Sequence, residues 1–268
     1  ISGCTLLSQD AIYKSISRAK KDFRQATKDT DFDLTFRQVS ENEITIVEEI
    51  LYAVFNIGFD SFSEKIKSII NEDLCLEALA LGKILSDQFE RTTTKNLLAL
   101  FCFHLARIPS KVKNDKIISF FEQDKKKWNN DFIKLAFHYL KKPKKLNKYY
   151  VEALIASKHM IATKNDIEHW NEIIKLYKIM LTLSNSPIMK LNLCYSLSKA
   201  QRMDEAKELL QIVENELPNE HIYLSLVKAN IFKNTQTLES EKIIDQVLKN
   251  INQKIRREYI LENMSSDF

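Results

Sequence analysis

Apolar residues recur at intervals of three and four along most of this chain, which is the spacing of helices with one buried face. From Glu41 they are Ile44, Val47, Ile50, Leu51, Val54 and Phe55, and Gly58 then predicts the end of that helix. The same spacing predicts further helices at residues 74–85, 92–106, 130–140, 149–163, 165–183, 187–199, 203–216 and 239–252. Residues 111–114 read as a basic turn, and we expect the last helix, 239–252, with the charged tail to Phe268 to act as a solvent-facing cap.

Two helix pairs near the C-terminal end repeat with a period of about 34 residues, a period typical of helix-turn-helix solenoids. Leu193 corresponds to Val227 in the next pair, and Ala206 corresponds to Ser240. The two small residues stand where a tetratricopeptide repeat (TPR) has a small residue in its second helix. Because two repeats bury too little apolar surface alone, we expect the earlier helices to extend the array. The prediction is an all-α fold of stacked helix pairs, a TPR-like α-solenoid.

Composition supports a helical interior and points away from catalysis. Only 3 glycines and 4 prolines occur in 268 residues, too few for the turns of a sheet-rich protein. The sequence has no glycine-rich phosphate loop, no glycine-flanked nucleophile and no HExxH motif, so we expect no enzyme activity, no cofactor and no metal site.

The spacing of the cysteines and the hydropathy of the chain bear on the cellular compartment that we expect for the protein. Cys4, Cys75, Cys102 and Cys194 are far apart and form no CxxC pair, which favours structural thiols in a reducing cytoplasm. The longest apolar stretches are much shorter than a membrane span, and no targeting signal is visible. The net charge of +4 is too small to indicate nucleic acid by itself, so any basic surface must be local.

The first predicted helix, at about residues 8–25, has the pattern of a helix that lies in a DNA groove. Ser8 is a good N-cap, and an apolar stripe of Ile12, Ile16, Ala19 and Phe23 leaves a polar, basic remainder. The side chains that we expect to approach bases or phosphates are Gln9, Asp10, Tyr13, Lys14, Ser17, Arg18 and Lys21. The alternative is an amphipathic helix that only packs, with its charged face in solvent.

The chain resembles bacterial extracytoplasmic-function RNA polymerase sigma factors that carry a TPR-like C-terminal extension. The first helix is similar to the recognition helix of the domain that reads the promoter −35 element. In the extension the resemblance rests on residues 51–59, 73–78, 97–100, 106–107, 123–125, 128, 152–156, 159, 170, 176–177, 186–187 and 191–192. The chain departs from the family pattern at Ile57, Phe59, Lys125 and Lys127.

The resemblance implies a domain organisation and a set of partners. Residues 1–28 would be the end of the promoter-reading domain, the remnant of a helix-turn-helix, followed by a linker at 29–40 and the helical-repeat extension at 41–268. The chain would be the C-terminal part of a longer factor whose partners are core RNA polymerase and promoter DNA. The extension would dock on the promoter-reading domain and regulate it.

One consequence and one rival interpretation follow. A single helix cannot hold its orientation in a groove, so we expect this chain alone to bind promoter DNA weakly or not at all. The rival is a free-standing TPR-like scaffold for protein–protein interaction, in which the array binds a peptide and the first helix is a cap.

Two further groups of residues stay open on the sequence alone. The polar and aromatic members of the family segments either hold helix pairs together or line a groove for a peptide or small molecule; they are Arg107, Asp124, Trp128, His159 and Trp170. The lysine runs at 125–127 and 141–145 either contact nucleic acid or an acidic polymerase surface, or are solvated turns.

Overall fold

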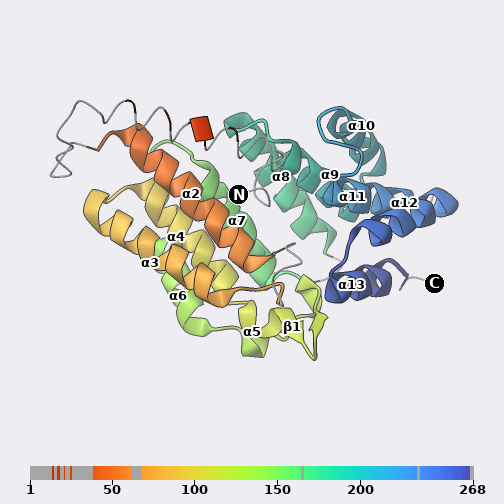
Figure 1. The fold of residues 1–268 in the computed structure, drawn as a ribbon, viewed down its shortest axis with the longest axis horizontal. Coiled ribbons are helices and arrows are strands. Elements are labelled where there is room, and N and C mark those ends of the chain that lie inside the picture. The colour runs from red at the N-terminus through yellow and green to blue at the C-terminus, as the bar shows by residue number, and fades with distance from the viewer. Residues whose placement is uncertain are drawn as a thin grey trace. The chain divides into compact units, whose positions relative to one another are not determined.

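The computed structural model describes residues 39–61, 68–163, 166–233 and 236–265, with five isolated positions nearer the N-terminus, Lys14, Ser17, Arg18, Lys21 and Gln25. The described chain is almost entirely helical (Figure 1). It divides into two compact units, Ile1–Ile84 and Leu85–Phe268, each of which is described by itself. The predicted all-α fold class of stacked helix pairs is confirmed.

In the first unit, α2 (Glu41–Phe59) is followed by α3 (Glu72–Phe89), which continues into the second unit. α2 begins at a capping box, in which Glu43 N donates to Ser40 Oγ at 3.3 Å and Ser40 N donates to Glu43 Oε2 at 2.9 Å. At the other end Asn71 N donates to the carbonyl of Gly58 at 2.7 Å. This backbone hydrogen bond joins the end of α2 to the residue before α3.

Gly58 is needed for close packing and not for the turn that its position suggested. It lies inside α2, which ends one residue later, and its φ is not positive. A Cβ at this position would lie 2.9 Å from Cys75 Sγ and 3.0 Å from the carbonyl oxygen of Asn71. The glycine therefore lets α3 approach α2.

The second unit contains the larger part of the described chain. After the shared α3 its helices, two short strands and two 3₁₀ turns follow in the order α4 (Thr92–Leu105), α5 (Ile108–Lys111), β1 (Val112–Lys113), β2 (Lys116–Ile117), η1 (Phe120–Glu122), η2 (Lys125–Lys127), α6 (Asn130–Tyr139), α7 (Lys148–Ile161), α8 (Ile167–Leu183), α9 (Pro187–Lys199), α10 (Met203–Glu214), α11 (Ile222–Phe232), α12 (Thr237–Asn250) and α13 (Lys254–Ser265).

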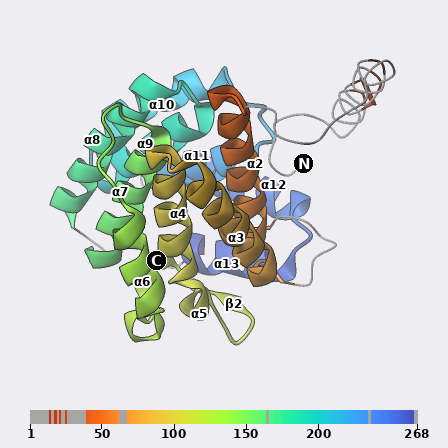
Figure 2. The same cartoon turned by 90° about the vertical axis from the view of Figure 1, so that its left-hand side faces the viewer.

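Successive helices of this unit pack on one another as an array. α4 packs against α6 and α7, α7 against α8, α8 against α9, and α9 against both α10 and α11 (Figures 1 and 2). α4 is buried on all sides along residues 97–103. A single apolar cluster then runs from Val151 in α7 to Ile231 in α11. Helices before the predicted repeat therefore do extend the stack, as the small buried surface of two repeats requires.

The repeat itself is visible in the packing. Ala206 in α10 is completely buried, and Ser240, its equivalent in α12, is 3% exposed. The Ser240 hydroxyl donates to the carbonyl of Ala229 in α11 at 2.9 Å. Both positions need small side chains because the second helix of each pair crosses the first closely there.

Two predictions about local structure are wrong. The basic turn at 111–114 belongs to a hairpin, in which β1 and β2 are antiparallel and Asn114 and Asp115 have φ values of 51° and 57°. Two left-handed residues form the turn that matches the twist of a hairpin. The residues after 252 include α13 and are not a plain charged tail: Ile260 is buried with Val247, Leu248 and Ile251, and Glu262 pairs with Lys116 of β2.

Candidate functional site

Part of the predicted DNA-contacting helix lies among the described residues. Lys14, Ser17, Arg18 and Lys21 are helical and exposed, as is Gln25. Spacings of three and four place them on one face, which therefore carries three cations within two turns. The other expected contacts, Gln9, Asp10 and Tyr13, lie outside the described residues, and so does the predicted apolar stripe.

A second group of predicted residues meets in the second unit around an aromatic–histidine cluster, made of Phe120, Phe121, Trp128, His159, His169 and Trp170. Phe120 lies 6.0 Å from Trp128 and 5.6 Å from His159, measured between ring centroids. Phe121 lies 5.8 Å from Trp170 and 6.4 Å from His169. The edge-to-face and tilted contacts join α7 and α8 to the 3₁₀ turn η1.

Polar side chains at the edge of this cluster stabilise it through hydrogen bonds and one cation–π contact. The Arg107 guanidinium stacks 4.2 Å from the centroid of Phe120, and its Nε donates to Gln123 Oε1 at 3.3 Å. Gln123 Nε2 in turn donates to the carbonyl of Ile118 at 3.2 Å. The Trp128 indole N–H donates to Ser110 Oγ at 2.8 Å. These contacts hold the segment between α4 and α6 in place against the cluster.

Arg107 and Asp124, which the sequence analysis named together, have different roles in the structure. The Asp124 carboxylate caps η2 by accepting from Lys126 N at 3.1 Å. The next residue, Lys125, uses its ammonium to bind the carbonyls of Met160 at 2.9 Å and Ala162 at 3.1 Å at the end of α7. A cation is favoured beside the carbonyls at the C-terminal end of a helix, so Lys125 has a structural role there.

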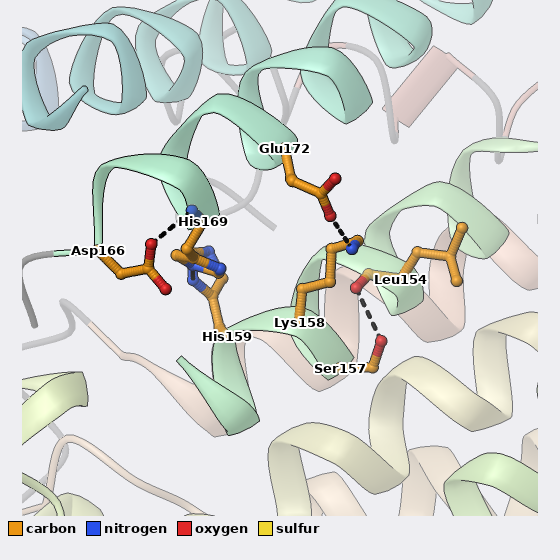
Figure 3. A network of polar contacts seen from close by, with 7 residues as sticks. All are labelled: Leu154, Ser157, Lys158, His159, Asp166, His169 and Glu172. Atoms are coloured by element: carbon orange, nitrogen blue, oxygen red, sulfur yellow. Dashed lines mark hydrogen bonds and ion pairs between the residues drawn. The ribbon is translucent and has the colours of Figure 1, made fainter. Parts of the chain in front are cut away.

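The two histidines of the cluster form a direct pair between the end of α7 and the start of α8 (Figure 3). His159 Nδ1 lies 3.0 Å from His169 Nε2, so one ring donates and the other accepts. Asp166 begins α8 by accepting from the backbone N–H of His169 at 2.9 Å. Beside the pair, Lys158 of α7 forms an ion pair with Glu172 of α8.

The electrostatics of the pair keep it neutral. Burial lowers the pKa of His159 to about 3, with further lowering by the neighbouring His169 and Arg107 charges. Burial also lowers the pKa of His169, although Asp166 opposes that shift. A group with a pKa near 3 is a weak base at neutral pH, so His159 is poorly suited to general base catalysis.

A hollow of about 340 Å³ lies next to His169 and is lined mainly by charged side chains. They are Lys158, Asp166, Glu168 and Glu172, accompanied by Ile161 and Ala162. Small-molecule sites are mostly apolar with a few polar groups, and this lining has the opposite balance. Trp128 and Trp170, which were expected to line a groove or hold helices together, are 6% and 5% exposed, which favours the packing role.

The thiols and possible metal ligands of the described chain add no further site. Cys75, Cys102 and Cys194 are buried and free, and burial raises the pKa of Cys102 to about 12. Within the described ranges, no three His, Cys, Asp or Glu side chains are placed to hold a metal ion. In the same ranges, every helix is too short or too polar to cross a membrane.

Sequence reasoning missed several residues of the cluster. Phe120, Phe121 and His169 stand in no recognisable motif, and Ser110 and Gln123 act through side-chain hydrogen bonds that no sequence pattern marks. The one available signal was the aromatic pair at 120–121 beside a predicted turn, since exposed turns seldom carry two phenylalanines.

Comparison with known proteins gives little functional information. A family of unknown function (DUF6596) matches residues 43–144, which comprise α2 to α6 with the connecting turns. Over 231 residues the chain is 25% identical to an uncharacterized protein of Rhizobium meliloti (strain 1021), a match that covers 84% of this chain and 54% of that protein. The chain thus spans about half the length of this relative. No solved structure matches it.

Proposed function

We propose that this chain is the C-terminal part of a sigma factor that directs RNA polymerase to promoters. The observation that supports the proposal is the exposed helical face of Lys14, Ser17, Arg18 and Lys21 ahead of an all-helical array. Such a face offers hydrogen-bond donors and positive charge to a DNA groove. In the whole factor a preceding domain would engage core RNA polymerase in the cytoplasm.

The helical array is the regulatory part in this proposal, and it has no enzyme activity of its own. A linker at residues 29–40 keeps the array at high effective concentration beside the DNA-reading helix, so modest contacts are enough to mask or brace it. The array would dock on the promoter-reading domain and set its activity in place of a separate anti-sigma partner.

The test is promoter-dependent transcription by the full-length factor with core polymerase. Lys14→Ala and Lys21→Ala together should reduce transcription from the cognate promoter at least tenfold, because each lost phosphate or base contact weakens DNA binding. Lys242→Ala with Lys249→Ala, two exposed α12 lysines, makes the matched control and should leave transcription unchanged.

A second experiment tests the regulatory role. Deletion of residues 41–268 from the full-length factor should change the transcription rate, upward if the array masks the helix and downward if it braces it. Unchanged transcription would refute the regulatory role.

The rival function, a peptide-binding scaffold, is favoured by one feature of the array. α9 is buried on most of its surface but exposes Asn192, Tyr195 and Lys199, which share one face. Repeat arrays use such faces for peptides. If the full-length protein failed to bind core polymerase, as measured by co-sedimentation, the scaffold would be the better interpretation.

A further inference from the structure

Positive charge in this protein is concentrated around α6. Residues 125–148 contain nine lysines and one acidic residue, Asp131, whereas the whole chain carries a net charge of only +4. The remainder of the chain is therefore net acidic. General attraction to polyanions would be weak, so strong attraction must come from local clusters of positive charge such as this region.

Eight of these lysines are exposed, and the ammonium of one of them, Lys125, is bound to carbonyls at the end of α7. The other seven form what we call the α6 lysine surface: Lys126, Lys127, Lys134, Lys141, Lys142, Lys144 and Lys145. Among the described residues, the one ion pair made by this group joins Lys134 to Asp131, at 3.3 Å and with both side chains largely in solvent. Such a pair stabilises little and is easily exchanged. The surface is thus available to an external anion.

α6 separates the lysines into two clusters. Lys126 and Lys127 precede its first turn, and the run at 141–145 follows its last. A ten-residue helix is about 15 Å long, so the clusters are about one groove width apart on a B-DNA duplex, whose major groove is about 12 Å wide.

The position of α6 keeps both clusters accessible. The helix packs along α4 (Figure 2). Ala136 is buried, whereas Lys134, Phe137 and His138 are exposed. At its two ends, Asn129 N donates to the Ala106 carbonyl at 2.9 Å and Lys141 N donates to Asn96 Oδ1 at 2.9 Å. These bonds hold the two lysine clusters at the opposite ends of α4.

The chemistry of the surface favours nucleic acid over protein or membrane. All of its cations are lysines, and lysine is depleted at protein–protein interfaces, where arginine is preferred. A membrane-binding helix needs an apolar face opposite its cations. In α6 the apolar face is used on α4, since Ala136 is buried and the Phe137 ring lies 5.1 Å from the Phe103 ring of α4, measured between centroids.

We propose that the α6 lysine surface binds the phosphate backbones of duplex DNA without sequence preference. The two clusters would contact the strands on either side of a groove, and α6 would face the groove between them. This surface is distinct from the promoter-reading helix, and the proposal does not depend on the sigma-factor function. It gives the array a second, electrostatic attachment to DNA.

The experiment is fluorescence anisotropy of a labelled 30-base-pair duplex of arbitrary sequence, titrated with the 268-residue chain between 30 and 150 mM salt. If five or six phosphates are contacted, the logarithm of the affinity should fall with the logarithm of salt concentration with a slope of about −5. Lys141→Gln with Lys145→Gln should weaken binding at least tenfold at the lowest salt and make the slope shallower by about 2.

The matched control is Lys242→Gln with Lys249→Gln on α12, which changes the net charge equally on another face. It should leave the affinity within twofold of the unaltered chain. Lys14→Gln with Lys21→Gln measures how much the first helix contributes to binding. Only Lys141→Gln with Lys145→Gln should make the slope of log affinity against log salt shallower by the full amount of about 2. Thermal unfolding verifies that each variant is folded.

Three outcomes would overturn the proposal. They are equal weakening by the α6 and α12 variants, tighter binding of duplex RNA of the same length than of DNA, and α6-dependent binding to anionic vesicles with none to DNA. Because the duplex carries no promoter, failure here would leave the transcription test of the first helix unaffected.

Discussion

Acid should destabilise the second unit through His159, and the direction follows from its pKa. The folded-state pKa is about 3, whereas an unperturbed histidine titrates near 6.5. Between these values the unfolded chain binds a proton that the folded chain does not. Stability is therefore complete above pH 6.5 and falls as the pH decreases toward 3.

The magnitude follows from the same shift. Each pH unit inside the window costs about 1.4 kcal/mol for one such histidine, so acidification from pH 7.0 to 4.5 should remove about 2.5 kcal/mol through His159. His104, whose pKa burial also lowers to about 3, should remove a similar amount. His159→Phe keeps a ring among the aromatic neighbours and removes the titrating group, so it should abolish the part of the loss that His159 contributes, about 2.5 kcal/mol.

The assay is urea unfolding followed by tryptophan fluorescence at pH 7.0 and 4.5. The two tryptophans of the chain, Trp128 and Trp170, both belong to the aromatic–histidine cluster, so the signal reports on this unit. His138→Phe is the matched control, because it makes the same substitution at an exposed site on α6 outside the cluster. If His159→Phe lost as much stability between the two pH values as the unaltered chain, the assignment of a buried neutral His159 would be wrong.

Three substitutions test the packing. Gly58→Ala should lower the stability of the α2–α3 unit by about 1 kcal/mol, because overpacking against Cys75 outweighs the gain in helix propensity; circular dichroism in urea measures it. Ser240→Ala should cost about 1 kcal/mol through the lost hydrogen bond to α11, and a thermal midpoint equal to that of the unaltered chain would contradict that role. Trp128→Phe should cost about 2 kcal/mol, since the bond to Ser110 and part of the packed ring are lost; Trp170 fluorescence during urea unfolding reports it.

Helix positions were largely predictable because their causes are local. The predicted helices at 92–106, 187–199 and 203–216 are within two residues of α4, α9 and α10 at both ends. Pro187 at the start of α9 and the capping box of α2 act on neighbouring backbone groups alone. The repeat was visible for a similar reason, since Ala206 and Ser240 mark a helix crossing that recurs at a constant interval.

The candidate site was predictable only in part. Arg107, Trp128, His159 and Trp170, singled out as polar or aromatic members of the family segments, lie in or beside one cluster in the structure. Phe120 and His169, which also belong to it, were not singled out. The contacts join residues up to 49 positions apart, and no spacing rule links an arginine after α4 to histidines on α7 and α8.

The sequence by itself determined that this protein is an array of helices with one local concentration of lysine, because periodicity, capping and charge are properties of neighbouring residues. Only the tertiary structure decided that α13 is a helix, since its order depends on burying Ile260 and pairing Glu262 with a strand 146 positions earlier. Likewise, only packing decided that His159 and His169 form a neutral pair: sequence separation says nothing about burial, and burial sets their pKa.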